Sequence, residues 1–240
     1  MEPWTLFTDT CRSWNLEITE GQIEQLKKYA DLLTETNKVM NLTAITDEAG
    51  IVEKHFLDSL SSANAVDYRG GKTLLDVGTG AGFPGIPLKI LFPDLQVVLL
   101  DSLAKRVNFL NRVIEELGLE KITAVHGRAE DFARKPVYRD HFDLVTSRAV
   151  ARLSVLAEYC LPFVRPGGLF VSYKAGDASA EAKDAEYAVK ILGAVREKEV
   201  MLTFGPSSLE RTFYLFRKEK PTPKAYPRKA GTPEKKPLVK

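Results

Sequence analysis

A short apolar run that ends in a cluster of glycines constrains the fold of this chain more than any other feature. Residues 74–87 read LLDVGTGAGFPGIP, so a strand delivers Asp76 and is followed by glycines 78, 80 and 82. Residues without a Cβ let the backbone turn sharply and approach a ligand closely. We predict that a helix begins near Pro84 or Gly85. In an open α/β sheet this turn lies outside the carboxyl ends of the strands, where ligands bind.

The chain after residue 72 alternates between apolar, β-rich runs and helical stretches. The clearest helices are 103–117, which Gly118 ends, and 178–192. Such alternation favours a mostly parallel sheet covered on both faces. Residues 205–211 are too few for a crossover helix, so we expect the last two strands to pair antiparallel. The seven predicted strands are 73–77, 96–100, 122–126, 142–146, 169–173, 199–204 and 212–216.

The segment before this alternating region is predicted to be a helical extension. Thr19 and Gln22 have the spacing of a capping box. A second helix start at Asp47 follows a polar connection, 37–46. We therefore divide the chain into a helical extension (1–65), an α/β domain (66–217) and a basic tail (218–240). The apolar positions that share a helical face are Ile23, Leu26, Ala30 and Leu33, and the second helix carries Ile51, His55, Phe56 and Leu60.

Length and composition are those of a globular protein with a real core. The 240 residues suffice for one large domain with an appendage, and 44% hydrophobic with 28% charged residues excludes collagen-like, wholly disordered and coiled-coil chains. Cys11 and Cys160 form no disulfide framework and no metal-ligand spacing, so we predict no metal. The chain shows no secretory signal and no apolar run of about 18 residues. We expect a monomeric, cytoplasmic protein without membrane contact.

Positive charge is concentrated at the C-terminus. The net charge is +2, yet residues 217–240 hold nine Lys or Arg, two Glu and five prolines. This composition predicts an extended or disordered tail.

Two cofactor classes use a glycine turn of this kind. Gly80, Gly82 and Gly85 satisfy G-x-G-x-x-G, the dinucleotide pattern, which leaves an NAD-dependent oxidoreductase as one hypothesis. Asp76 would repel a pyrophosphate but attract the ammonium group of S-adenosylmethionine. Asp101 ends the second strand, where a carboxylate accepts hydrogen bonds from ribose hydroxyls in either class. A non-catalytic RNA-binding module is a third hypothesis.

Further short motifs lie on both sides of the glycine turn in the sequence. They are 37–43 (NKVMNLT), 55–59 (HFLDS), Asp101-Ser102 with Lys105-Arg106, 127–130 (GRAE), 146–150 (TSRAV), Tyr226-Pro227-Arg228 and Gly231-Thr232-Pro233. Over nearly the whole chain, these motifs closely resemble the RsmG family, also called glucose-inhibited division protein B.

The resemblance implies a Rossmann-like, class I S-adenosylmethionine-dependent methyltransferase with a seven-stranded sheet. It implies a bacterial enzyme that modifies N7 of one guanine in the 16S RNA of the small ribosomal subunit. The cofactor pocket implied by the resemblance involves Gly78, Phe83, Ala129, Glu130 and Arg148. The general methyltransferase pattern adds Asp76, Gly80 and Asp101 with less specificity.

The resemblance also implies that the basic tail contacts RNA phosphates and orients the RNA. We expect deletion of the tail to weaken RNA binding and to leave cofactor affinity largely intact. The candidate RNA-binding residues are Lys224, Tyr226, Arg228 and Lys229, of which Tyr226 is expected to stack on a base.

The implied reaction predicts a site without a general base. Guanine N7 offers a lone pair without first losing a proton, so we assign no catalytic residue. Orientation of the reacting groups can supply about 7–11 kcal/mol. His55 is accordingly interpreted as a packing or capping histidine. We expect the guanine to be exposed in a loop or flipped out of its helix, because the major groove of A-form RNA is too narrow for side chains.

Overall fold

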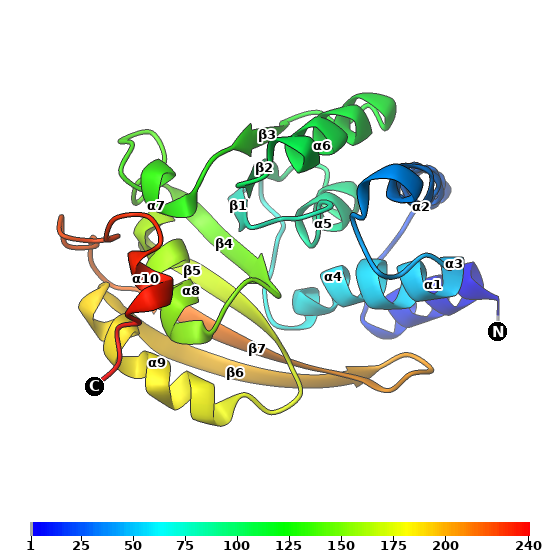
Figure 1. The fold of residues 1–240 in the computed structure, drawn as a ribbon. Coiled ribbons are helices and arrows are strands. Elements are labelled where there is room, and N and C mark those ends of the chain that lie inside the picture. Colours follow the sequence, from blue (N-terminus) through cyan, green and yellow to red (C-terminus); the bar gives the residue numbers. More distant parts are fainter. Residues whose placement is uncertain (1) are drawn as a thin grey trace.

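Seven strands form one mixed sheet in this computed structural model, which describes residues 2–240. The strand order is β3-β2-β1-β4-β5-β7-β6, and β7 alone points in the direction opposite to the other six strands (Figure 1). The predicted sheet and its closing antiparallel pair are confirmed. The strands are β1 (Thr73–Val77), β2 (Gln96–Asp101), β3 (Ile122–His126), β4 (Phe142–Arg148), β5 (Val164–Ala175), β6 (Ala194–Phe204) and β7 (Leu209–Lys218).

Helices cover both faces of the sheet, as the alternation predicts. Because side chains alternate along a strand, Leu74 packs into the core on one face and Leu75 into the core on the other. The first face carries α5 (Gly85–Leu91) and α6 (Ala104–Glu116). The second carries α8 (Leu153–Cys160), the short 3₁₀ turn Leu161–Phe163 and α9 (Ser179–Ile191), with α7 (Ala129–Phe132) nearby.

Residues 2–64 are largely helical. Thr19 and Gln22 form the predicted capping box at the start of α2, and Asp47 caps α3 through the Gly50 amide. The elements are α1 (Pro3–Ser13), α2 (Glu20–Met40), α3 (Glu48–Ile51), a π-helical stretch (Val52–Leu57), α4 (Asp58–Leu60) and a 3₁₀ turn (Ser61–Asn64).

The polar connection predicted at 37–46 is shorter than expected. Helix α2 continues through Met40, and Asn41 ends it in the left-handed conformation. The Asn37 side chain accepts hydrogen bonds from the Leu42 and Thr43 amides, at 2.6 and 2.9 Å. Asn37 therefore caps the end of the helix and does not belong to a loop, because Asn side chains readily form hydrogen bonds with nearby backbone groups.

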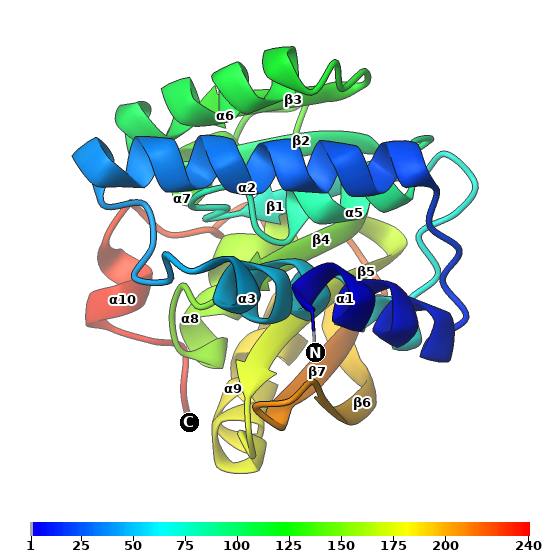
Figure 2. The same cartoon turned by 90° about the vertical axis from the view of Figure 1, so that its right-hand side faces the viewer.

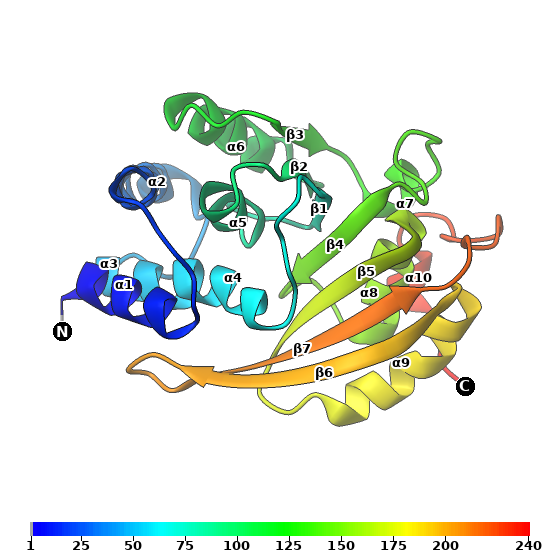
Figure 3. The ribbon, with the colours of Figure 1, turned by 180° about the vertical axis from the view of Figure 1, so that it is seen from behind.

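The helical extension packs on the α/β region through one continuous apolar core. Figure 2 shows α2 lying across the molecule close to α6 and α5. At the other end, the Ser207 amide and hydroxyl each donate to Glu53 at 2.8 Å, so the tip of the long β6–β7 hairpin contacts the extension (Figure 3). The division at residues 65 and 217 stays a prediction. Among residues 2–240, no helix is both long and apolar enough to cross a lipid bilayer.

The C-terminal segment is ordered and packed, which corrects the expectation of an extended or disordered tail. After β7 it passes close to α7 and α8 and forms the short helix α10 (Thr232–Lys235) before the last residues (Figure 1). Lys218 is fully buried, and its Nζ donates to Asp140 and to the Leu161 and Val164 carbonyls. The charge count predicts solvated cations, but several of these cations have partners inside the fold.

Candidate cofactor and substrate site

Two adjoining cavities lie at the carboxyl edge of the sheet. The larger edge cavity has a volume of about 430 Å³ and lies between the glycine turn, β5 and the helical extension. The smaller edge cavity has a volume of about 230 Å³ and lies between the ends of β1 and β2, the start of α7 and the C-terminal segment. Gly78 lines both cavities. The strand ends therefore converge on one site, as predicted.

Two glycines of the turn are required by close packing and by backbone conformation. Gly78 has a φ of +70°, and a Cβ there would lie 2.6 Å from Val150 Cγ2. Gly82 has a φ of +106°, and a Cβ there would lie 2.5 Å from the Tyr29 hydroxyl. The Tyr29 hydroxyl also donates to the Ala81 carbonyl. Helix α2 thus holds the turn from outside the α/β region.

The Asp76 side chain braces the turn and does not face either cavity. It has no exposed surface and accepts hydrogen bonds from Thr79 Oγ1 at 2.7 Å, from the Gly85 amide at 2.9 Å and from Thr146 Oγ1 at 3.3 Å. Burial raises the pKa of this carboxyl group to about 6, although the hydrogen bonds oppose the shift. Asp76 therefore joins the glycine turn to the start of α5, and its predicted contact with the cofactor stays a prediction.

This raised pKa predicts a measurable pH dependence. Between its ordinary value of 3.8 and about 6, the folded chain keeps a proton on Asp76 that the unfolded chain has lost. The contribution of this group to stability therefore falls as pH rises through that window. We expect the difference in unfolding free energy between the wild type and Asp76→Asn to change across the window, as measured by urea denaturation. A constant difference would contradict the assignment.

Asp101 stands beside the turn at the end of β2 and also bonds within the chain. Its Oδ2 accepts from the Gly80 amide at 2.9 Å and its Oδ1 from the Leu103 amide at 2.9 Å. Arg106 Nη1 lies 3.4 Å from Oδ2. Only 3% of the residue is exposed. Asp101 thereby joins the glycine turn to the start of α6, and its predicted bond to a ribose stays a prediction.

Ala129 and Glu130 are the first two residues of α7 and line the smaller edge cavity. Amides in the first turn of a helix have no acceptor within that helix, so they can donate to a ligand. The Glu130 carboxylate is buried and accepts from the Gly231 amide at 2.8 Å. Burial and the nearby charges of Glu130 and Glu234 raise the pKa of Tyr159 to about 12. Tyr159 therefore remains a neutral hydroxyl beside this cavity.

Arg148 belongs to a nearly buried cluster at the larger edge cavity. Its Nη1 lies 2.6 Å from Asp58 Oδ2, and Arg211 Nε lies 2.6 Å from Asp58 Oδ1. Asp58 is 1% exposed. Arg148 Nη1 also donates to the Lys54 carbonyl at 3.1 Å. The two guanidinium groups are thus held at the cavity wall by one carboxylate from α4.

Phe83 lines the same cavity and is held by stacking. Its ring lies 4.5 Å from the His55 ring at 12° and 5.3 Å from the Tyr29 ring at 26°. The Arg148 guanidinium lies 5.2 Å from the Phe83 centroid, within cation–π range. His55 is buried and hydrogen-bonded to Thr43 Oγ1 at 2.8 Å, consistent with a packing histidine. Burial, and then the Arg148 charge, lower the pKa of His55 to about 4.

The candidate RNA-binding residues of the tail differ in accessibility. Lys224 and Lys229 are exposed, and Tyr226 is half-buried. Arg228 is not a free cation, because its Nε and Nη2 contact both oxygens of the buried Glu158 carboxylate at 2.6–3.1 Å. The RNA role of all four residues stays a prediction.

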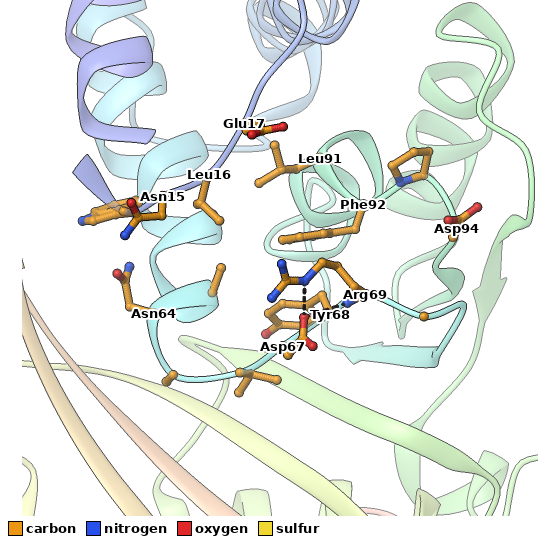
Figure 4. Close-up of a pocket in the computed structure, with 16 residues that line it drawn as sticks. Asn15, Leu16, Glu17, Asn64, Asp67, Tyr68, Arg69, Leu91, Phe92 and Asp94 are labelled. Atoms are coloured by element: carbon orange, nitrogen blue, oxygen red, sulfur yellow. Dashed lines mark hydrogen bonds and ion pairs between the residues drawn. The ribbon is translucent and has the colours of Figure 1, made fainter. Parts of the chain in front are cut away.

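A third cavity, of about 720 Å³, lies away from the predicted site, at the amino ends of β1 and β2. Figure 4 shows its wall of Tyr68, Arg69 and Phe92, with Asp67 paired to Arg69. None of the predicted site residues lines it. Among residues 2–240, no group of three or more His, Cys, Asp or Glu side chains is placed to hold a metal ion.

Comparison with known proteins decides the family. A sequence model of the family described as rRNA small subunit methyltransferase G matches residues 22–207. The chain belongs to this family. It is 52% identical over 234 residues to the ribosomal RNA small subunit methyltransferase G of Lachnoclostridium phytofermentans, covering 98% of this chain and 97% of that protein. The corresponding protein of Exiguobacterium sibiricum is 48% identical over 232 residues, covering 97% and 98%.

A solved structure supports the fold independently. The crystal structure of a SAM-dependent methyltransferase from Aquifex aeolicus superposes with a TM-score of 0.54 at 17% identity, covering 73% of this chain and 96% of that one. Family membership confirms the resemblance seen in the motifs, the Rossmann-like fold, the methyltransferase class and S-adenosylmethionine as cofactor. The oxidoreductase and the non-catalytic RNA-binding module are set aside.

Sequence reasoning missed several residues that build the site. Asp58 lies in the motif HFLDS, which supports the resemblance but was given no role. Tyr29 follows the apolar stripe of its helix and reads as core. No local pattern predicts the roles of Arg211 and Glu158, because their partners Asp58 and Arg228 are 70 or more residues away. Tyr159 is likewise brought to the smaller edge cavity only by the fold.

Proposed function

We propose that the chain transfers a methyl group from S-adenosylmethionine to N7 of one guanine in 16S ribosomal RNA. The observation that carries the proposal is the pair of edge cavities that share Gly78, one beside amides at the start of α7 and the other walled by cations. Relatives with about half of their residues identical are named for methyl transfer to small-subunit ribosomal RNA. N7 and the single target base follow from the resemblance in the motifs.

The residues at the edge fit this cofactor. A Cβ on Gly80 would meet no atom within 4 Å, so this part of the turn borders open space. We assign the adenine end to the smaller edge cavity, where the amides of Ala129 and Glu130 can donate. We assign the methionine end to the larger edge cavity, where Arg148 can pair with a carboxylate. The cofactor supplies an electrophilic methyl group.

The residues around the larger edge cavity position the reacting groups and exchange no proton with them. His55 is the nearest imidazole, and its pKa of about 4 makes it a poor proton acceptor at neutral pH. Phe83, buried beneath His55, shapes an apolar surface beside the turn. Because guanine N7 already presents a lone pair, the residues that line this cavity need only orient the reacting groups and exclude water.

This account predicts a flat pH profile. The single-turnover rate of methyl transfer is expected to vary by less than about twofold between about pH 6 and pH 8, because no group in the site has to lose a proton. His55→Gln should show the same flat profile, even if its rate is lower through lost stacking. A rate that rises with pH in the wild type and becomes flat in His55→Gln would identify a general base and contradict the mechanism.

The RNA is proposed to reach the larger edge cavity over its basic rim. Arg106, Lys174 and Arg211 line this cavity. Cations at the rim can hold backbone phosphates while the target base enters. Because the enzyme must reach N7, the guanine is proposed to be unstacked from its helix. We further propose that the protein acts as a cytoplasmic monomer without a metal.

The proposed reaction is tested by methyl transfer from labelled S-adenosylmethionine. The substrates are small ribosomal subunits, and the RNA extracted from them, both from a strain that lacks this modification. The modified base is mapped by cleavage at N7-methylguanine. We expect one labelled guanine in 16S RNA. Label on another atom or on many guanines, or no label on either substrate, would contradict the proposal.

A further inference from the structure

The C-terminal segment is fastened to the α/β region by a buried ion pair. Glu158 is 1% exposed in its side chain, and its two oxygens contact the Arg228 fork at 2.6–3.1 Å. The Arg228 amide also donates to Glu158 Oε1 at 2.7 Å. Bidentate pairs of this kind fix geometry as well as add energy. This pair is called the latch below.

Three further contacts hold the same segment. Arg139 donates through its guanidinium to the carbonyls of Thr222 and Tyr226, at 2.7 and 3.0 Å. Arg134 Nη2 donates to the Pro227 carbonyl at 2.6 Å. Both arginines donate hydrogen bonds to backbone carbonyls of the segment. These bonds restrict its motion relative to the α/β region. The segment is therefore held along residues 222–231 and not at one point.

The segment reaches the cofactor site at its distal end. The Gly231 amide donates to Glu130 at 2.8 Å, and Glu130 lines the smaller edge cavity. Glu234, in α10, lines that cavity as well, together with Ala129 and Tyr159. The C-terminal segment thus contributes Glu234 to the lining of this cavity and holds a second lining residue, Glu130, through the Gly231 amide.

We propose that the C-terminal segment, residues 219–240, forms the outer wall of the adenine subsite and that the latch positions this wall. Arg228 is a positioning residue in this account, because it acts through the segment and not on the cofactor. Glu234 places a carboxylate where it can accept a hydrogen bond from an exocyclic amino group of a purine. This inference rests on the cofactor placement proposed above.

This placement changes the expected effect of removing the C-terminal segment. A solvated basic tail predicts that its removal affects RNA binding alone. A wall of the adenine subsite predicts that its removal weakens cofactor binding even without RNA. Binding and ordering are reciprocal, so a bound cofactor should also protect the segment. Both consequences are measured with S-adenosylhomocysteine as the probe and no RNA present.

The first experiment measures the Kd of S-adenosylhomocysteine by calorimetry for Arg228→Gln, Glu158→Gln and the double variant. We expect each single variant to raise Kd at least about tenfold, and the double variant to add little, because either change opens the same latch. Lys183→Gln is the matched control, since it removes an exposed charge of α9, outside the C-terminal segment and both edge cavities. Its Kd should stay within twofold of the wild type. Equal Kd values for latch variants and control would overturn the proposal.

The second experiment uses the unaltered protein and so does not depend on the folding of any variant. Limited trypsin digestion cleaves after Lys224 and Lys229, both exposed in the segment. We expect saturating S-adenosylhomocysteine to slow cleavage after Lys229 at least about fivefold, while NAD has no effect. Cleavage at an unchanged rate, with the probe shown to bind, would refute the wall. Failure of the probe to bind the wild type would instead refute the proposed cofactor site.

Discussion

Asp58→Ala is expected to destabilise the protein by about 3–5 kcal/mol, the range for removal of one partner from a buried ion pair. Asp58 is the single carboxylate between Arg148 and Arg211, and only 1% of it is exposed. Its removal leaves two guanidinium groups, each less than one-fifth exposed, without their counter-charge. For a chain of this size, we expect the Tm to fall by roughly 10 °C in differential scanning calorimetry.

The matched control for this change is Asp67→Ala. Asp67 also pairs with an arginine, Arg69, at 2.7 Å, but both side chains are more than half exposed. Exposed pairs contribute little to stability, so the Tm should stay close to that of the wild type. A loss for Asp58→Ala no larger than that for Asp67→Ala would show that the cluster at the larger edge cavity does not stabilise the fold.

Arg148→Gln is expected to raise the Kd of S-adenosylhomocysteine by about 10- to 100-fold. The substitution keeps a polar side chain but removes the charge proposed to pair with the carboxylate at the methionine end. A hydrogen bond to a charged group contributes about 1.5–3 kcal/mol, which corresponds to about that loss in affinity. Asp58 retains Arg211 as a partner, so the variant should remain folded. Calorimetric titration measures the Kd directly.

Arg165→Gln controls for the loss of one arginine. Arg165 pairs with Asp143 at 2.7 Å and is half exposed at the start of β5, away from both edge cavities. Its Kd for S-adenosylhomocysteine should match that of the wild type. If Arg148→Gln binds the probe as tightly as this control, the larger edge cavity does not hold the methionine end through Arg148.

The fold could be predicted closely because its signals are local. Strands β1 and β3 have the predicted bounds, since the hydrophobic run and the residues that break it lie within a few positions. Strands β5 and β6 begin five residues earlier than predicted. There the chain is polar, and pairing with neighbouring strands extends the β structure beyond its apolar part. Tertiary pairing of this kind overrides local propensity.

The site could be predicted only where its chemistry lies in the backbone or in a motif. The glycine turn and the start of α7 follow from sequence, and Gly78, Ala129 and Arg148 do line the edge cavities. Asp76 shows the limit, because an acidic strand end looks the same whether it faces a ligand or the turn behind it. Arg228 shows a second limit, because its buried partner Glu158 is 70 residues away and no local pattern indicates the pair.

The central claim is that one cofactor spans both edge cavities across Gly78, and a crystal structure of the complex with S-adenosylhomocysteine tests it most directly. The account predicts adenine against Ala129, Tyr159 and α10, with the amino-acid end beside Arg148. A ligand bound in the reverse direction, or seated in the distant cavity between Tyr68 and Phe92, would contradict it.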